Sequence, residues 1–222
     1  MNRTAVVKSL VDVGLVPIVR ASSSEEALKV VEAIRAAGVS TVEITMTVPG
    51  AIRVLETLSG ELGGKVLLGA GTVLDPETAR LAILAGAEFL ISPALNVKVI
   101  EMTRRYSKVS IPAGLTPTEI VTAWEAGADF VKVFPCGAMG GADYIKALKA
   151  PLPHVEMIPT GGVSLETASA FLKAGAAAIA VGGEIVDKKA VREKRWEVVT
   201  DNTRKFVEIV SHTRKEMAAS KA

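Results

Sequence analysis

The sequence alternates eight times between a short apolar stretch and a longer stretch in which apolar residues recur with helical spacing. Short apolar stretches bounded by turn residues predict buried strands, and the longer stretches predict helices, several of which end at a glycine such as Gly86 or Gly127. The predicted strands are Leu15–Arg20, Val42–Thr45, Val66–Ala70, Phe89–Ser92, Val109–Pro112, Asp129–Pro135, Glu156–Pro159 and Ala178–Val181. Alternating strands and helices imply parallel strands joined by right-handed crossovers, so the pattern predicts an α/β fold, a (β/α)8 TIM barrel. A doubly wound open sheet is the alternative, but no Gly-x-Gly-x-x-Gly follows the first strand.

The chain is predicted to form one barrel domain over residues 1–222, with the core of the barrel at about 15–186. A short amphipathic helix over Arg3–Val13 is predicted before the barrel, and a long charged helix over about 190–216 after it. Helix starts are expected at Ser24 as an N-cap, at Asp75-Pro76, at Thr116-Pro117 and at Ser164, whose helix is expected to reach Ala174.

Charge and cysteine content exclude several classes of protein. There are 26 basic and 24 acidic residues, a net charge of +2, which gives no electrostatic footprint for nucleic acid or an anionic membrane. Cys136 is the single cysteine, so an intramolecular disulfide and a cysteine-based metal site are both excluded. The first residues do not resemble a signal peptide, and no apolar run reaches membrane-spanning length. We therefore expect a cytoplasmic protein.

A lysine in the predicted sixth strand is the first candidate for chemistry. Lys132 lies in the apolar run Asp129–Pro135, where a buried ammonium would cost several kcal/mol to desolvate, or would have a lowered pKa and be neutral and nucleophilic. The alternative is an edge strand whose Lys132 points to water. If Val131 and Val133 face the helices, then Phe130, Lys132 and Phe134 face the barrel interior.

The second predicted strand places a carboxylate in the same interior. Two sets of side chains alternate there: Val42, Ile44 and Met46 on one face, and Glu43, Thr45 and Thr47 on the other. The apolar set suits the helices, so the polar set is predicted to point inward. A structural layer of hydrogen-bonded Thr and Glu is the alternative, but a lysine and a glutamate in one interior perturb each other's pKa, which is typical of functional sites.

Other strand ends add polar residues and glycines where barrel enzymes bind their substrates. They are Arg20, Thr72, Pro93 and the glycine pairs Gly161-Gly162 and Gly182-Gly183. Glycines after the seventh and eighth strands match the usual phosphate site of these barrels. The two histidines, His154 and His212, lie away from these strand ends, so no metal site and no cofactor is expected. A neutral lysine that forms an iminium can activate a carbonyl substrate in place of a metal.

Taken in order, these residues resemble a known family of aldolases. The segments that carry the resemblance are Glu43-Ile44-Thr45, Gly69-Ala70-Gly71-Thr72-Val73, Ile91-Ser92-Pro93, Lys132-Val133-Phe134-Pro135 and Pro159-Thr160-Gly161-Gly162-Val163. They are similar to 2-keto-3-deoxy-6-phosphogluconate (KDPG) aldolase, a family that includes 4-hydroxy-2-oxoglutarate (KHG) aldolase activity, and the match runs from about Val16 to Val186. The resemblance implies a homotrimeric class I aldolase that cleaves a small 2-keto acid.

The resemblance also implies residue roles. Lys132 would form the Schiff base and Glu43 would shuttle protons. Thr72 and the loop after Pro93 would hold the pyruvyl carboxylate, and Phe134 would wall the pocket. Many members have an arginine where this chain has Thr47, which leaves Arg20 as the anion partner.

A second departure concerns the phosphate. Members often have a serine in the strand-eight phosphate loop, where this chain has Gly183 followed by Glu184. KHG cleavage and cleavage of a related phosphosugar acid are therefore alternatives to KDPG cleavage. A phosphosugar epimerase or decarboxylase and a non-enzymatic trimeric scaffold are the more distant alternatives.

Overall fold

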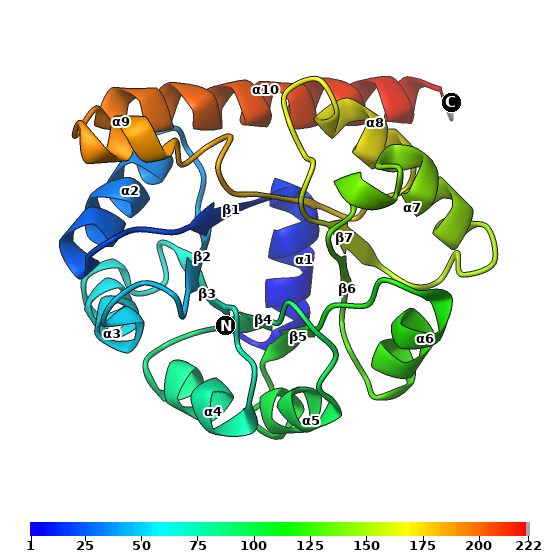
Figure 1. The fold of residues 1–222 in the computed structure, drawn as a ribbon, viewed down its shortest axis with the longest axis horizontal. Coiled ribbons are helices and arrows are strands. Elements are labelled where there is room, and N and C mark those ends of the chain that lie inside the picture. The colour runs from blue at the N-terminus through cyan, green and yellow to red at the C-terminus, as the bar shows by residue number, and fades with distance from the viewer. Residues whose placement is uncertain (221–222) are drawn as a thin grey trace.

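The computed structural model describes residues 1–220 and shows a barrel of parallel strands enclosed by helices (Figure 1). The strands are β1 (Leu15–Val19), β2 (Thr41–Thr45), β3 (Leu67–Gly71), β4 (Phe89–Ile91), β5 (Val109–Ile111), β6 (Val131–Val133), β7 (Met157–Pro159) and β8 (Ile179–Val181). Six of them form a sheet in the order β5-β4-β3-β2-β1-β8, and β6 pairs with β7. The two sheets join where Lys132 N–H donates to Pro112 O at 2.9 Å and where Thr160 bridges Ala180. The predicted (β/α)8 barrel is therefore confirmed.

Helices follow the strands in turn and cover the outside of the barrel. They are α2 (Ser24–Ala36), α3 (Ala51–Leu62), α4 (Pro76–Leu84), α5 (Val97–Arg105), α6 (Pro117–Glu125), α7 (Ala142–Lys149), α8 (Ala168–Lys173), α9 (Lys188–Arg192) and α10 (Trp196–Ala219), with a 3-10 turn over Gly137–Met139. Asp75 and Thr116 cap α4 and α6 with their side chains, each before a proline at the first helical position. Among residues 1–220, no helix is long and apolar enough to cross a bilayer.

The leading helix α1 (Arg3–Val13) closes one end of the barrel, and Figure 1 shows it behind the ring of strands. Val6 and Leu10 are buried in the same cluster as the barrel residues Phe89 and Phe130. The Arg3 guanidinium forms an ion pair at 2.7 Å with Asp129, which precedes β6. Because α1 covers the N-terminal ends of the strands, the carboxyl ends form the accessible side.

Strand parity divides the core as the sequence predicts. Val42, Ile44, Val131 and Val133 pack in the outer cluster between strands and helices. Phe130 packs in the inner cluster instead. With alternate side chains on opposite faces, this placement directs Lys132 and Glu43 into the barrel.

Three helix predictions are wrong in detail. Ser23, not Ser24, is the N-cap of α2, because Ser23 Oγ accepts from the Glu26 N–H while the Ser24 hydroxyl donates to Pro49 O. The helix expected from Ser164 begins at Ala168, because Thr167 Oγ1 accepts from the Ser164 N–H and donates to Gly162 O, which holds 164–167 in a turn.

The helix expected over about 190–216 is two helices, α9 and α10. The chain turns between them at Lys194, which has a φ of 57°, and the Arg195 N–H donates back to Ala190 O at 2.8 Å. No glycine or proline marks this break in the sequence.

Candidate active site

The Lys132 amine is buried inside the barrel. The residue lies at the centre of β6 with 4% of its surface exposed, which excludes the alternative of an edge strand with its lysine in water. Its Nζ is 4.9 Å from the centroid of the Phe134 ring. Burial lowers the pKa of Lys132; the charge of Glu43 opposes this shift and the charge of Arg20 adds to it. Burial thus shifts the balance of Lys132 toward its neutral form, which is the form that can act as a nucleophile.

Glu43 faces the same interior from β2 and is 1% exposed. Burial raises its pKa, while the positive charges of Lys132 and Arg20 act in the opposite direction. Within residues 1–220, its Oε2 has no hydrogen-bond partner. A carboxyl group with a raised pKa and a free oxygen is suited to both donating and accepting a proton.

Gly71 provides the space that the Glu43 carboxyl group occupies. A Cβ at Gly71 would lie 1.6 Å from Glu43 Oε1, so any side chain there would displace the carboxyl group. Our sequence analysis gave Gly71 no role of its own. The available signal is a glycine at the end of a strand, which often marks a close approach of another group.

Lys132 and Glu43 interact through their charges but form no direct contact of the ion-pair or hydrogen-bond kind. In the part of the chain that the structure describes, no ion pair or hydrogen bond joins them. Each nevertheless shifts the other's pKa, so their charges lie within electrostatic range. A pair arranged in this way can act on two different atoms of one bound molecule.

Three of the predicted residues lie at the ends of β2, β3 and β4. Thr47 is exposed, and its hydroxyl is 2.8 Å from that of Thr45, which in turn donates to Val19 O at 3.1 Å. Thr72 directly follows β3 with a φ of 59°, a strained value for threonine that is typical of functional sites. Pro93 follows β4 and is partly buried. All three lie on the accessible side of the barrel.

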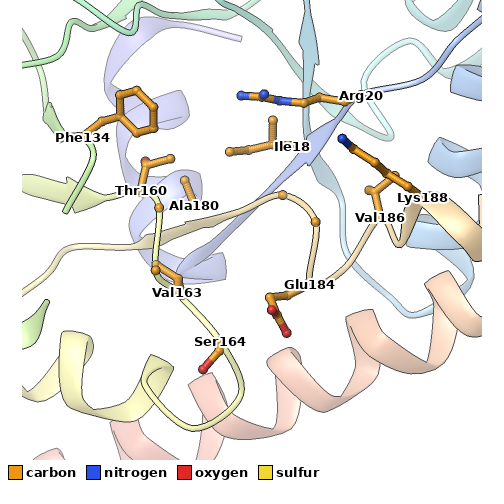
Figure 2. A pocket seen from close by; sticks show the side chains of 14 residues that line it. Ile18, Arg20, Phe134, Thr160, Val163, Ser164, Ala180, Glu184, Val186 and Lys188 are labelled. Carbon is orange, nitrogen blue, oxygen red and sulfur yellow. The ribbon is translucent and has the colours of Figure 1, made fainter. Parts of the chain in front are cut away.

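A cavity of about 420 Å³ brings the other predicted residues together at the ends of β1, β6, β7 and β8 (Figure 2). Its lining includes Arg20, Phe134, Thr160, Gly161, Gly162, Gly182 and Gly183. Thr160 is 5% exposed, and its Oγ1 has no hydrogen-bond partner within residues 1–220. Lys132 and Glu43 are not part of the lining; Phe134 and Arg20 connect the cavity to them, through the ring that Lys132 contacts and the charge that acts on both groups.

The loops after β6 and β7 touch backbone to backbone beside this cavity. A Cβ at Gly162 would lie 2.6 Å from the Cα of Gly137, and one at Gly137 would lie 2.7 Å from the Cα of Gly162. The Gly137 N–H donates to Gly161 O at 2.8 Å, and the Cys136 N–H donates to Thr160 O at 3.0 Å. The strand that carries Lys132 is therefore fixed against the glycine loop.

Sequence analysis missed several residues that line the cavity, among them Ile18, Ser164 and Lys188. Ile18 follows from strand parity on β1, which also places Val16 inside. Lys188 is the first residue of α9, and no sequence signal ties that helix to the site. Glu184, whose role the sequence left open, also lines the cavity, but Figure 2 shows its carboxylate directed away from Arg20.

Comparison with known proteins identifies the family. The family model described as "KDPG and KHG aldolase" matches residues 6–202. The chain belongs to this aldolase family.

Two curated relatives of this aldolase illustrate the range of the family. The 2-dehydro-3-deoxy-6-phosphogalactonate aldolase of Escherichia coli is 36% identical over 77% of this chain and 83% of its own. The 2-dehydro-3-deoxy-phosphogluconate aldolase of Haemophilus influenzae is 29% identical over 92% of this chain and 96% of its own.

Solved structures agree with this aldolase in fold. The structure described as native KDPGal is 32% identical, with a TM-score of 0.83, and covers 90% of this chain and 96% of its own. The KDPG aldolase of Legionella pneumophila, captured with pyruvate as a covalent carbinolamine, is 28% identical with the same TM-score and coverage. Resemblance and comparisons thus name the same family, and the chain is a lyase of the aldolase type.

Proposed function

We propose that this aldolase is a class I enzyme that cleaves KDPG to pyruvate and glyceraldehyde 3-phosphate. The observation that carries the proposal is the Lys132 amine, which is buried in the barrel and has a pKa that burial lowers. A neutral amine is required for attack on a ketone, and a desolvated lysine is a recognised way to obtain one. The carbinolamine formed with pyruvate in the Legionella pneumophila relative supports the same chemistry.

The reaction divides between Lys132 and Glu43. The Lys132 amine adds to the C2 ketone, and loss of water from the carbinolamine gives a protonated Schiff base. Glu43 removes the proton from the C4 hydroxyl, the C3–C4 bond breaks, and its electron pair moves toward the iminium to give the enamine of pyruvate. The C4 fragment leaves as glyceraldehyde 3-phosphate. Protonation of the enamine at C3 and hydrolysis then release pyruvate and the free amine.

The remaining predicted residues bind the two ends of the substrate. Thr72 and the loop after Pro93 hold the pyruvyl carboxylate at the ends of β3 and β4. The cavity at β1, β7 and β8 receives the phosphate end. Gly162, Gly183 and Glu184 lie outside helices and strands, and their backbone N–H groups donate no hydrogen bond in the described chain. These groups are therefore available for an anion.

Borohydride trapping tests this proposal. The protein is incubated with pyruvate and sodium borohydride, and the modified residue is mapped by peptide mass spectrometry. We expect the reduced adduct on Lys132 and none in Lys132→Met. Lys146→Met, which removes an exposed lysine from α7, is the matched control and should label normally. An adduct on another lysine, or no adduct, contradicts the mechanism.

The second candidate substrate is KHG, which would give pyruvate and glyoxylate. The observation that favours it is the loop after β8, where Gly183 and Glu184 provide no hydroxyl group to bind a phosphate. Turnover of KDPG, of its galactonate counterpart and of KHG separates the candidates. We expect the highest kcat/KM for a phosphorylated acid, and a higher value for KHG would replace the first choice of substrate.

We also infer that the protein is a homotrimer. Four exposed aliphatic side chains lie on and beside the neighbouring helices α4 and α5, namely Leu74, Leu81, Leu84 and Val97. The Asn96 side chain ties the two helices together by donating to Leu74 O at 2.9 Å. Exposed aliphatic patches of this kind are typical of protein interfaces. A protein cage designed by fusing symmetric oligomeric domains, 31% identical with a TM-score of 0.86 over 94% of this chain and 76% of its own, also supports an oligomer.

A further inference from the structure

The cavity at β1, β7 and β8 holds a lysine that no motif assigns to the site. Three charged side chains line the cavity: Arg20, Glu184 and Lys188. Figure 2 shows the Lys188 side chain extending from the start of α9 toward Arg20, while the Glu184 carboxylate points the opposite way. The part of the cavity beside β1 is therefore positively charged.

Glu26 lines the adjoining cleft with both cations, but its carboxylate accepts hydrogen bonds from Ser22 and pairs with neither of them. In the described residues, no ion pair or side-chain hydrogen bond involves Arg20 or Lys188. Two unpaired cations on one wall repel each other, and an anion between them relieves this repulsion. Without Lys188, Arg20 alone would give this part of the cavity its positive charge.

The backbone that carries Lys188 is fixed. Ile185 and Val186 are buried, and both of their N–H groups donate to Gly182 O, at 3.0 and 2.9 Å. Asp187 caps α9 by accepting from the Ala190 N–H at 2.6 Å, and Ala190 and Val191 are buried. Lys188 thus projects from a rigid base attached to the end of β8.

The hydroxyl groups of the cavity are not placed to bind an anion in its outer part. Ser164 Oγ donates to Glu166 at 2.5 Å, so this hydroxyl is engaged, and no hydroxyl side chain lies at Gly183 or Glu184. Thr160 Oγ1 is without a partner within residues 1–220, but it lies deep, with Ala180 and Phe134 as neighbours on the lining. The outer part of the cavity therefore offers backbone N–H groups and the two cations to an anion.

We propose that Lys188 is a specificity-determining residue of this aldolase, whose ammonium group binds the substrate's terminal phosphate together with Arg20. The inference rests on the proposed function, since it concerns the same substrate. It adds that the preference for a phosphorylated over an unphosphorylated 2-keto acid depends on α9. A phosphate that spans Arg20 and Lys188 gains charge-assisted hydrogen bonds from both.

Kinetics with two substrates test the proposal. Lys188→Gln should lower kcat/KM for KDPG by about tenfold, through KM, because charge-assisted hydrogen bonds at an exposed site have roughly this effect. Its kcat/KM for KHG, which has no phosphate, should change by less than about twofold. Lys188→Arg should restore most of the KDPG value. Equal losses with both substrates would overturn the proposal.

Arg192→Gln is the matched control. Arg192 lies on the same helix and lines the adjoining cleft with Lys188, but it is not part of the cavity lining. We expect its two kcat/KM values to stay near those of the unmodified enzyme. If Arg192→Gln matched Lys188→Gln, the effect would be a general loss of positive charge, and the specific role of Lys188 would be rejected.

Direct binding separates this inference from the proposed function. Calorimetric titration with glycerol 3-phosphate requires no catalysis, and Lys188→Gln should weaken its binding by about tenfold. Glycerol is the unphosphorylated control, and the Lys188→Gln enzyme should still trap pyruvate on Lys132 with borohydride. If Lys188→Gln traps pyruvate but binds glycerol 3-phosphate as tightly as the unmodified enzyme, only the role of Lys188 is rejected. If the unmodified enzyme does not trap pyruvate, the aldolase mechanism is rejected, and the titration still decides whether Lys188 binds phosphate.

Discussion

At the scale of single residues, the candidate site contains two buried ionisable groups whose charged forms are only partly stabilised by opposite charges nearby. Lys132 and Glu43 are almost fully buried, and burial favours the neutral form of each. Their mutual attraction opposes this effect without reversing it. Such a pair destabilises the fold at a pH where both are charged, and it provides the nucleophile and the proton carrier that we propose for the reaction.

Glu43→Gln should lower kcat for cleavage by about 10²- to 10⁴-fold, because a general acid–base group is lost. The amide cannot accept the C4 hydroxyl proton, while the Lys132 nucleophile remains. Steady-state turnover and pyruvate trapping measure the two effects separately. Near-normal kcat would assign proton transfer to another group.

The same substitution changes how stability depends on pH. The pKa of folded Glu43 is raised above 4.5, so its protonation stabilises the fold fully below about pH 4.5, and this contribution is lost as the pH rises through the folded pKa. We expect Glu43→Gln to gain unfolding free energy relative to the unmodified protein as the pH rises above about 4.5. Denaturant unfolding at fixed protein concentration measures it. Glu56→Gln, at an exposed position on α3, should show no such gain, and a difference that stays constant with pH would contradict the assignment.

Gly71→Ala tests the space that the Glu43 carboxyl group requires. The new methyl group would overlap Oε1, so the carboxyl group must move and kcat should fall by about 100-fold. Gly60→Ala is the control, because a Cβ at Gly60 on α3 meets nothing within 4 Å. Full activity in Gly71→Ala would show that the position of Glu43 is not critical.

At the scale of elements, α1 is attached to the barrel by a residue from the far end of the chain. Arg214 on α10 donates hydrogen bonds to Val11 O, Asp12 O and Ala177 O, and so holds the end of α1 beside the start of β8. These bonds satisfy carbonyl groups that a helix end leaves unpaired.

Arg214→Ala should lower the free energy of unfolding by about 2 kcal/mol, since hydrogen bonds from a charged donor are lost while their acceptors remain. Arg204→Ala, on the exposed side of the same helix, should change it by less than about 0.5 kcal/mol, because it removes only a surface ion pair with Asp201. Chemical denaturation at fixed protein concentration gives both values. Similar effects of the two variants would contradict a specific role for Arg214.

The elements also show what sequence can and cannot predict here. Strand parity predicted correctly that Val131 and Val133 face the helices, because period-two alternation determines which side chains share a face. The break between α9 and α10 was missed, because Lys194 adopts a positive φ that favours glycine. Lys188 was missed for a similar reason: its place at the cavity depends on how the turn after β8 directs the start of α9, which is a tertiary property.

At the scale of the whole molecule, the aliphatic patch on α4 and α5 predicts assembly. Leu81→Glu places a charge on this patch and should convert the proposed trimer to a monomer, because a buried unpaired carboxylate costs several kcal/mol. Light scattering after size-exclusion chromatography measures the mass. Val11→Glu is the control, because Val11 is an exposed residue on α1, away from this patch. An unchanged mass for Leu81→Glu would place the interface elsewhere.

The backbone contact between Gly137 and Gly162 has a consequence for how the enzyme measures its substrate. It couples the loop after β6, and with it the proposed nucleophile Lys132, to the loop that borders the proposed phosphate cavity. Neither glycine has a side chain whose rotation could adjust the spacing. The backbone then fixes the distance between the Lys132 nitrogen and the proposed phosphate subsite. We expect the enzyme to select chain length more strictly than it selects the configuration of individual hydroxyl groups. Phosphorylated keto acids one carbon shorter or longer than KDPG should therefore be poorer substrates than its epimers.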